Sequence, residues 1–212
     1  MSKVRAYISA SLDGYAAGPN QSEKDPLGEG GEQLHEWAVE LEAWRKSHGM
    51  EGGEVNASTQ VMEEFQAGIG AEIMGRGKFG PPGGGPWGDD PWQGWWGEHP
   101  PFHMPVFVVT HHEREPLTLS DTTFTFVTDG IESALEQARE AAGDEDILIG
   151  GGAAIINEYL AAGLVDELEI SVVPLILGSG ARLLEDVGEL ELEQLRAVEA
   201  PGVTHLKYRV IN

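Results

Sequence analysis

The sequence predicts an α/β protein with a mixed, mostly parallel central sheet. Segments of strand and helix character alternate along its 212 residues without an internal repeat. One strand segment, Asp146–Ile149, is apolar after its first residue, as strands are inside a parallel sheet that is covered on both faces. Two alternating segments, 190–199 and 203–211, flank a Pro-Gly pair and predict a terminal antiparallel hairpin.

Short β-branched and apolar runs indicate the remaining strands. They are expected at residues 3–9, 71–74, 106–110, 123–128 and 168–173. The segment 10–31, which follows the first strand, contains Gly, Pro and Asn and predicts a long loop.

Apolar residues at helical spacing predict the helices. One amphipathic helix is expected over residues 32–47, with its apolar face formed by Leu34, Trp37, Ala38, Leu41 and Trp44. Ser58 is expected to cap the start of a second helix. That helix and two later ones are marked by Val61, Met62 and Phe65, by Ile131, Leu135 and Ala138, and by Ile155, Ile156, Tyr159 and Leu160.

Residues 80–104 break this alternation, because they are too rich in Pro, Gly and Trp for regular structure. We interpret them as an ordered loop inserted into a single domain of residues 1–212, since the tryptophans must pack against something. Their indoles either line a substrate pocket or cap the core.

Composition excludes several classes of protein. The chain has 36 Asp and Glu against 13 Lys and Arg, a formal net charge of -23, so nucleic acid and anionic membranes would be repelled. It contains no cysteine, which excludes disulfides, thiolate nucleophiles and cysteine-based zinc sites. With neither a long apolar run nor a signal-peptide pattern, a cytoplasmic location is expected.

Four stretches carry no acidic residue, and in so acidic a chain a polyanionic ligand would bind there. They are residues 73–88, 99–112, 147–157 and 170–184. In the third stretch, Gly150, Gly151 and Gly152 join a strand to the start of a helix, where free backbone N–H groups and the helix dipole form an anion site. Glycine would let a phosphate approach the backbone, although a tight turn would use the same residues.

Two other strand ends carry suitable donors. Arg76 and Lys78 follow the strand at 71–74, and Thr110, His111 and His112 follow the next. Arginine offers a forked donor to phosphate and lysine a point charge. Because parallel strands end at one edge of a sheet, these groups and the glycines predict a nucleotide site there.

Several of these segments occur together and in the same order in a known family. The chain resembles the dihydrofolate reductase-like superfamily, and in particular the reductase domain that forms the C-terminal half of the bifunctional riboflavin-biosynthesis deaminase-reductase, the RibD C-terminal domain. The matching segments are YISASLDGYAAG (7–18), EIMGRGKFG (72–80), PVFVVTHH (105–112), ILIGGGAAIINEYLAAGLVDELEISVVPLILGSGARLLE (147–185) and GVTHLKYRV (202–210).

This resemblance implies a three-layer fold and an NADPH-dependent reductase that transfers a hydride to a small heterocycle, such as a dihydrofolate-like pterin or a pyrimidine intermediate of riboflavin biosynthesis. It places the adenosine 2′-phosphate beside Arg76 and the Thr110–His111 turn, the pyrophosphate at the triple glycine, and the nicotinamide beside Ala10. The residues that it assigns to the cofactor are Ala10, Gly75, Arg76, Gly77, Lys78, Thr110, His111, Ile149, Gly150, Gly151, Gly152, Ala153 and Ala154.

The catalytic residues are less defined, because the chain departs from the classical enzymes where a first-helix carboxylate faces the pterin. Asp13 in SLDG and Glu36 are the candidates for acid-base catalysis, with Glu32 as an equal alternative. Each also suits a structural role, Asp13 in a turn and the glutamates on a solvated helix face.

Two other functions fit parts of the sequence. A non-catalytic nucleotide sensor would keep the phosphate-binding groups and lose only the chemistry. A metal site could use the histidines at 99, 103, 111 and 112, but the Pro100-Pro101 pair rules out an ordinary helix between the first two, so no metal is expected. The hairpin exposes a strand edge, and the resemblance adds the expectation of a homodimer.

Overall fold

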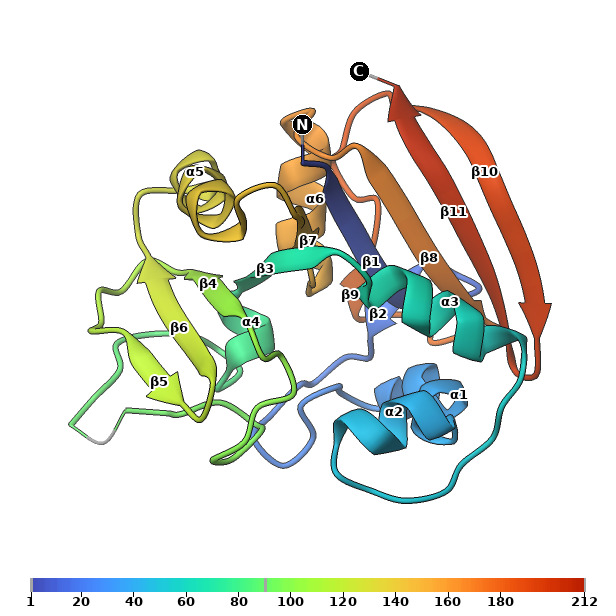
Figure 1. The fold of residues 1–212 in the computed structure, drawn as a ribbon, viewed down its shortest axis with the longest axis horizontal. Helices are drawn as coiled ribbons and strands as arrows, with labels where there is room; N and C mark the ends of the chain where they lie inside the picture. The colour runs from blue at the N-terminus through green and yellow to red at the C-terminus, as the bar shows by residue number, and fades with distance from the viewer. Residues whose placement is uncertain (1, 90, 212) are drawn as a thin grey trace.

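Residues 2–89 and 91–211 are described by a computed structural model, so Met1, Asp90 and Asn212 of the expected domain lie outside the described residues. In this part of the chain, nine strands form one sheet in the order β10-β11-β8-β1-β7-β3-β4-β6-β5 (Figure 1). The six strands from β8 to β6 are parallel to one another, while β10, β11 and β5 are antiparallel additions at the two sides. The predicted mixed, mostly parallel sheet is therefore confirmed.

For the large sheet, the bounds of every strand except β5, which was not predicted, agree with the sequence-based expectations to within a few residues. The large sheet comprises β1 (Val4–Ser11), β3 (Ile69–Gly75), β4 (Pro105–Val109), β5 (Leu117–Leu119), β6 (Thr122–Val127), β7 (Asp146–Ile149), β8 (Glu167–Val173), β10 (Glu191–Ala200) and β11 (Val203–Ile211). A small antiparallel sheet, which was not expected, pairs β2 (Tyr15–Ala17) with β9 (Ala181–Arg182) and interrupts the predicted loop at 10–31.

Helices α5 (Ile131–Ala142) and α6 (Ala153–Ala161) cover one face of the sheet. Their apolar side chains pack on β1, β3 and β7 in a core that we call cluster 1, which includes Ala6, Ile73, Ile149, Leu135 and Ile156. A continuously apolar central strand is typical of a sheet covered on both faces, and these helices cover one of them.

The opposite face carries two separate cores. Side chains alternate along a strand, so Tyr7 and Met74 point away from the cluster 1 residues Ala6 and Ile73. Tyr7 packs against cluster 2, formed by Leu34, Trp37, Ala38, Leu41, Met62, Val173 and Val203. Met74 belongs to cluster 3, formed by Met74, Phe79, Val106, Val108, Phe124 and Phe126.

Cluster 2 lies beneath short helices, and these correct a prediction. Instead of one helix over 32–47 there are three segments, η1 (Gly31–His35), α1 (Glu36–Val39) and α2 (Glu42–Ser47). The chain is extended at Leu41, with ψ at 139°, and Leu41 forms a bridge with Glu54. The break leaves Leu41 fully buried. The apolar pattern therefore identified the buried side chains but not the interruption of the helix.

Helix α3 (Ala57–Gln66) completes this cover, and its cap is a second correction. Asn56, not Ser58, is the N-cap, since its side chain accepts from the Ser58 backbone N–H at 2.9 Å. The Ser58 hydroxyl is instead buried against His205 on β11, with 2.8 Å between Oγ and Nε2.

Cluster 3 is covered by the predicted irregular loop, residues 80–104, which follows the short helix α4 (Arg76–Phe79). Its tryptophans pack on the phenylalanines of the core, and three of them donate their indole N–H to a backbone carbonyl. These bonds join Trp87 to His112, Trp92 to Phe79 and Trp95 to Lys78, at 2.9 to 3.0 Å. The tryptophans therefore cap the sheet where the other half of the face has helices.

Within the described ranges, no helix combines the length and apolar character needed to cross a membrane.

Candidate active site

The three predicted strand ends meet at one edge of the sheet. Strand β3 lies between β7 and β4, all three run in parallel, and each ends at this edge. The turns that follow are bonded to one another: the Gly75 N–H donates to the Gly151 carbonyl at 3.0 Å, and the Gly150 N–H donates to the Ile73 carbonyl at 2.9 Å. The edge thus brings Gly75, Arg76, Thr110 and the triple glycine into one region, as the nucleotide-site prediction requires.

The three consecutive glycines differ in the space that each position leaves for a side chain and in their backbone φ angle. A Cβ on Gly150 would lie 2.0 Å from Oε1 of Glu72. Gly151 has φ at +97°, a left-handed conformation that side chains disfavour. Gly152 has φ at −67°, and a Cβ added there would meet nothing within 4 Å, so packing does not demand glycine at this position.

Gly152 is also the N-cap of α6, and no side chain caps that end of the helix. The exposed Ala154 and the buried Ala153 form its first turn, shortly after the buried Ile149. Backbone N–H groups at a helix start attract anions, and a residue without a side chain lets one come close. This end of α6 therefore fits the pyrophosphate role expected of it.

Lys78 does not extend freely from the edge. Its ammonium donates to Oε1 of Glu72 at 2.7 Å and to the carbonyl of Gly150 at 2.9 Å. Because Glu72 is on β3 and Gly150 follows β7, the lysine ties the two turns together. Gly77, beside it on α4, is exposed.

Arg76 points toward the loop that covers cluster 3. Its guanidinium lies 3.8 Å from the ring centre of Trp87, and one N–H donates to the Gly80 carbonyl. Its Nε is buried without a hydrogen-bond partner. Burial lowers the pKa of Arg76, and the positive charge of Arg114 lowers it further.

Arg114 is a functional candidate that sequence reasoning missed. Its guanidinium lies 4.8 Å from the Trp87 ring centre and 4.7 Å from that of Phe126. No carboxylate pairs with Arg76 or Arg114 among the described residues, despite the chain's acidity. Two adjacent, partly buried guanidiniums without a counter-charge suit a multiply charged anion.

The end of β4 lies beside these arginines. Thr110 is buried, its N–H donates to the Val127 carbonyl at 3.0 Å, and its hydroxyl accepts from the His112 N–H at 3.3 Å. His111 is exposed, and Trp87 donates to the His112 carbonyl. Ala10, near the end of β1, is buried at 2% exposure.

Asp13 serves as an anchor between two loops. Its carboxylate accepts from the Ser11 hydroxyl at 2.6 Å and from the backbone N–H groups of Leu177 and Gly178 at 3.1 and 2.7 Å. These bonds, the one from Ser11 most strongly, lower the pKa of Asp13, so the group is ionised at neutral pH. An ionised, fully engaged carboxylate suits the holding of a loop better than the donation of a proton.

Glu36 is exposed on α1 and lines a groove of about 370 Å³ with Val173, Pro174 and the hairpin turn at Pro201-Gly202. Glu32 is exposed as well. His35, at the end of η1, is half-buried; burial lowers its pKa, and a hydrogen bond with the Gly31 backbone opposes that shift. No sequence signal distinguished His35 from its acidic neighbours.

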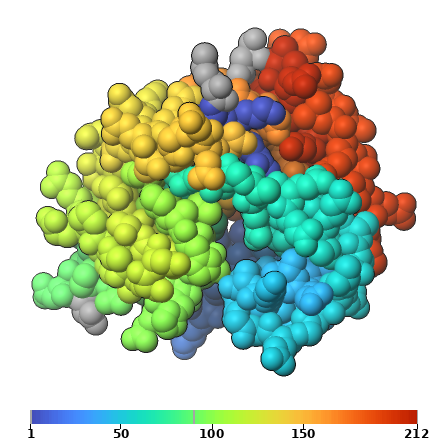
Figure 2. All heavy atoms as spheres, in the orientation of Figure 1, coloured from blue at the N-terminus to red at the C-terminus, as the bar shows by residue number. Residues whose placement is uncertain are grey.

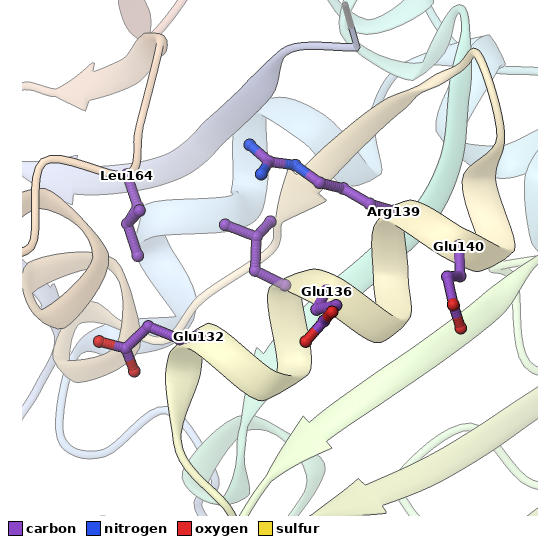
Figure 3. A pocket seen from close by; sticks show the side chains of 6 residues that line it. Glu132, Glu136, Arg139, Glu140 and Leu164 are labelled. Atoms are coloured by element: carbon purple, nitrogen blue, oxygen red, sulfur yellow. The ribbon is translucent and has the colours of Figure 1, made fainter.

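A larger groove, of about 550 Å³, lies elsewhere on the molecule, along the outer side of α5 (Figure 3). Glu132, Glu136, Arg139 and Glu140 line it together with Leu164, and none of the predicted site residues does. Across the described ranges, no three His, Asp or Glu side chains gather closely enough to hold a metal ion. His103 is paired with Asp121 at 2.8 Å.

Comparison with known proteins identifies the family of the chain. The family model described as the RibD C-terminal domain matches residues 2–206. The chain belongs to the RibD C-terminal domain family. The uncharacterized protein YyaP of Bacillus subtilis is 36% identical over 91 residues, which are 42% of this chain and 47% of that relative, so the match spans less than half of its length.

Solved structures confirm the dihydrofolate reductase-like fold. A putative riboflavin biosynthesis protein from Shewanella superposes with a TM-score of 0.64 at 20% identity, over 99% of both chains. Dihydrofolate reductase from Enterococcus faecalis, solved with NADP(H), superposes with a TM-score of 0.51 at 12% identity, over 99% of this chain and 97% of that one.

Proposed function

We propose that this member of the family is an NADPH-dependent reductase that acts on a small heterocyclic substrate. The observation that carries the proposal is the edge where the start of α6, which no side chain caps, lies beside the guanidiniums of Arg76 and Arg114, which have no carboxylate partner among the described residues. The similar proteins support the same assignment, because one is described as a riboflavin biosynthesis protein and another as a reductase with bound NADP(H).

Each end of this edge suits a different part of the cofactor. The backbone at Gly152, Ala153 and Ala154 would bind the pyrophosphate, and the two arginines would bind the 2′-phosphate that distinguishes NADPH from NADH. The Trp87 ring keeps both guanidiniums at this position. NADPH, when bound, supplies the hydride.

The chain's own contribution is orientation and exclusion of water, which accounts for the lack of a conspicuous catalytic triad. Asp13 would hold the loop after β1 against residues 177–178, next to the strand that carries Ala10. The proposed substrate is a dihydrofolate-like pterin or a pyrimidine intermediate of riboflavin biosynthesis. The homodimer stays a prediction; within the described part, β10 has β11 on one side and an open edge on the other.

The test compares the dissociation constants of NADPH and NADH by calorimetric titration. We expect NADPH to bind more tightly, and Arg76→Ala to remove a preference on the order of 1.5–3 kcal/mol, roughly ten- to a hundredfold. Equal constants for the two cofactors in the unmutated protein would contradict the assignment. Oxidation of NADPH in the presence of a heterocycle panel then separates an enzyme from a protein that only binds the nucleotide.

A further inference from the structure

Strand β3 carries a carboxylate into the interior of the sheet. Glu72 lies between Ala71 and Ile73 and points, like Met74, away from cluster 1. It is 4% exposed, because β3 has a paired strand on each side, and acidic residues are rarely buried so fully without a partner. The proposed hydride transfer does not use this group. A carboxylate in this place requires a counter-charge, and the chain supplies one.

Lys78 is that partner, and it reaches the neighbouring strand as well. Its ammonium donates to Oε1 of Glu72 at 2.7 Å and to the Gly150 carbonyl at 2.9 Å. The tryptophan loop contacts the same lysine: the Trp95 indole donates to its backbone carbonyl at 3.0 Å, and the Phe102 ring centre lies 5.6 Å from the ammonium. Both the backbone and the side chain of Lys78 are therefore held in place.

The turn at Gly150 is built around this ion pair. A Cβ on Gly150 would lie 2.0 Å from Oε1 of Glu72 and 2.9 Å from Nζ of Lys78. Gly150 does not share the left-handed φ of Gly151, so the lack of space beside the two charged groups is what excludes a side chain. The carboxylate and the ammonium thus pack directly against the backbone that leads into α6.

The start of α6 depends on the same two turns. The Gly75 N–H donates to the Gly151 carbonyl at 3.0 Å, and a Cβ on Gly75 would lie 3.3 Å from Cβ of Ile155 in α6. A shift of the Gly150 turn relative to β3 would therefore move the backbone N–H groups at the start of α6. Those are the groups proposed above to bind the pyrophosphate.

Lys78 also lies where a phosphate could reach it. Helix α4 stands between the loop and the helices that cover cluster 2 (Figure 1), and the surface is hollowed between these two parts (Figure 2). The lysine side chain is 29% exposed, but its charge is matched by Glu72. Arg76 and Arg114, in contrast, have no carboxylate among the described residues. The arginines suit an anion, and the paired lysine suits a connection between turns.

We propose that Glu72 and Lys78 are positioning residues. Their ion pair holds the Gly150 turn against β3 and so fixes the backbone N–H groups that bind the pyrophosphate, while Lys78 is not itself a phosphate ligand. A buried ion pair adds little net stability, because desolvation offsets the attraction, but it favours a single geometry. This inference rests on the proposed reductase function and adds to it the residues that shape the cofactor site.

The experiment compares variants of the pair by calorimetric titration of the full chain with NADPH and NADH. We expect Lys78→Met and Glu72→Leu to weaken the binding of both cofactors about tenfold, because either change releases the turn. The double variant should bind no more weakly than either single one, since the pair acts as a unit. Glu72→Gln keeps an acceptor for the ammonium and should stay within about threefold of the unmutated protein.

Glu72→Leu separates positioning from direct binding by the sign of its effect. Removal of the carboxylate leaves the ammonium with its full charge, so a lysine that bound phosphate itself would hold both cofactors more tightly. Tighter or unchanged binding by a folded Glu72→Leu overturns the proposal, and so does a larger loss for NADPH than for NADH. Lys207→Met is the matched control and should leave both constants unchanged, because Lys207 is 22% exposed and pairs with Glu167 at 2.8 Å on β11, three strands from β7.

Amide hydrogen exchange without cofactor gives a second readout. The N–H groups of Gly75 and Gly150 bond across the two turns, and we expect both to exchange faster in Lys78→Met than in the unmutated protein or in Lys207→Met. Unchanged exchange would equally contradict the proposal.

Thermal unfolding shows whether each variant is folded. The double variant removes both charges, so it replaces a single variant that fails to fold, and its loss of affinity is then the one that decides. If the unmutated protein binds neither cofactor, the reductase proposal fails, while hydrogen exchange still decides whether the pair holds the turns.

Discussion

Under the helices of the second sheet face, the carboxylates of β8 are paired with cations, whereas under the tryptophan loop two cations have aromatic rings and backbone carbonyls beside them. On β8, Glu169 is held by Arg196 at 2.7 Å, and Glu167 by Lys3 and Lys207. On the loop side, the described structure provides no carboxylate for Arg76 or Arg114. We call the first half complete, because its carboxylates have counter-charges, and the second half incomplete, because its two cations have none among the described residues.

His205 provides the strongest test of the complete half. Its imidazole is fully buried and bonds to Ser171 and Ser58, each at 2.8 Å. Replacing it with leucine removes the imidazole from both hydroxyls, of which Ser171 keeps only Tyr7 at 3.1 Å, and we expect a loss of about 3 kcal/mol in the free energy of unfolding, measured in urea. His99→Leu is the matched control, because His99 is exposed and its replacement should cost less than about 1 kcal/mol. Equal losses in both variants would show that burial of the histidine does not matter.

The same histidine predicts a dependence of stability on pH. Burial, with a smaller effect of Arg196, lowers the pKa of His205 to about 4 from its ordinary value of 6.5. The unfolded chain therefore binds a proton between these values that the folded chain does not, and stability falls as the pH drops from 6.5 to 4, by up to about 3 kcal/mol. Above pH 6.5 the residue contributes no slope. Unfolding midpoints of the protein and of His205→Leu across this range should converge toward acid pH, and parallel curves would contradict the assignment.

Gly151 and Gly152 give a sharper test of the incomplete half. Gly152→Val adds a side chain where a Cβ would meet no atom within 4 Å, so the packing of the folded chain should be retained while NADPH binding weakens at least about thirtyfold. Gly151→Val, by contrast, should destabilise the fold because φ is +97°. Thermal unfolding and cofactor titration of the two variants separate the effects. Normal NADPH binding by a folded Gly152→Val would mean that nothing approaches the backbone there.

The sequence was sufficient for features that depend on local patterns. The apolar runs placed the strands, and the glycines with Arg76 and Thr110 identified the edge, because parallel strand ends must meet there. Local patterns could not reveal the break at Leu41, since helical spacing reports which side chains are buried and not whether the backbone is continuous. A partner distant in the chain was also beyond reach: Trp87 lies beside Arg114, which stands between two glutamates in the sequence and resembles an ordinary surface charge.

The smallest effect expected is also the most specific to the tryptophan loop. Arg114 lies over Trp87 and Phe126 and adds a second positive charge near Arg76, so Arg114→Ala should reduce the preference for NADPH over NADH by about tenfold. Arg139→Ala, on the exposed side of α5, is the matched control and should leave both constants unchanged. If Arg114 serves only to hold the loop on cluster 3, the variant will instead lower the unfolding midpoint and weaken the two cofactors equally. A selective loss of NADPH affinity assigns the unpaired charge to the 2′-phosphate, because NADH lacks that group and shares the rest of the site.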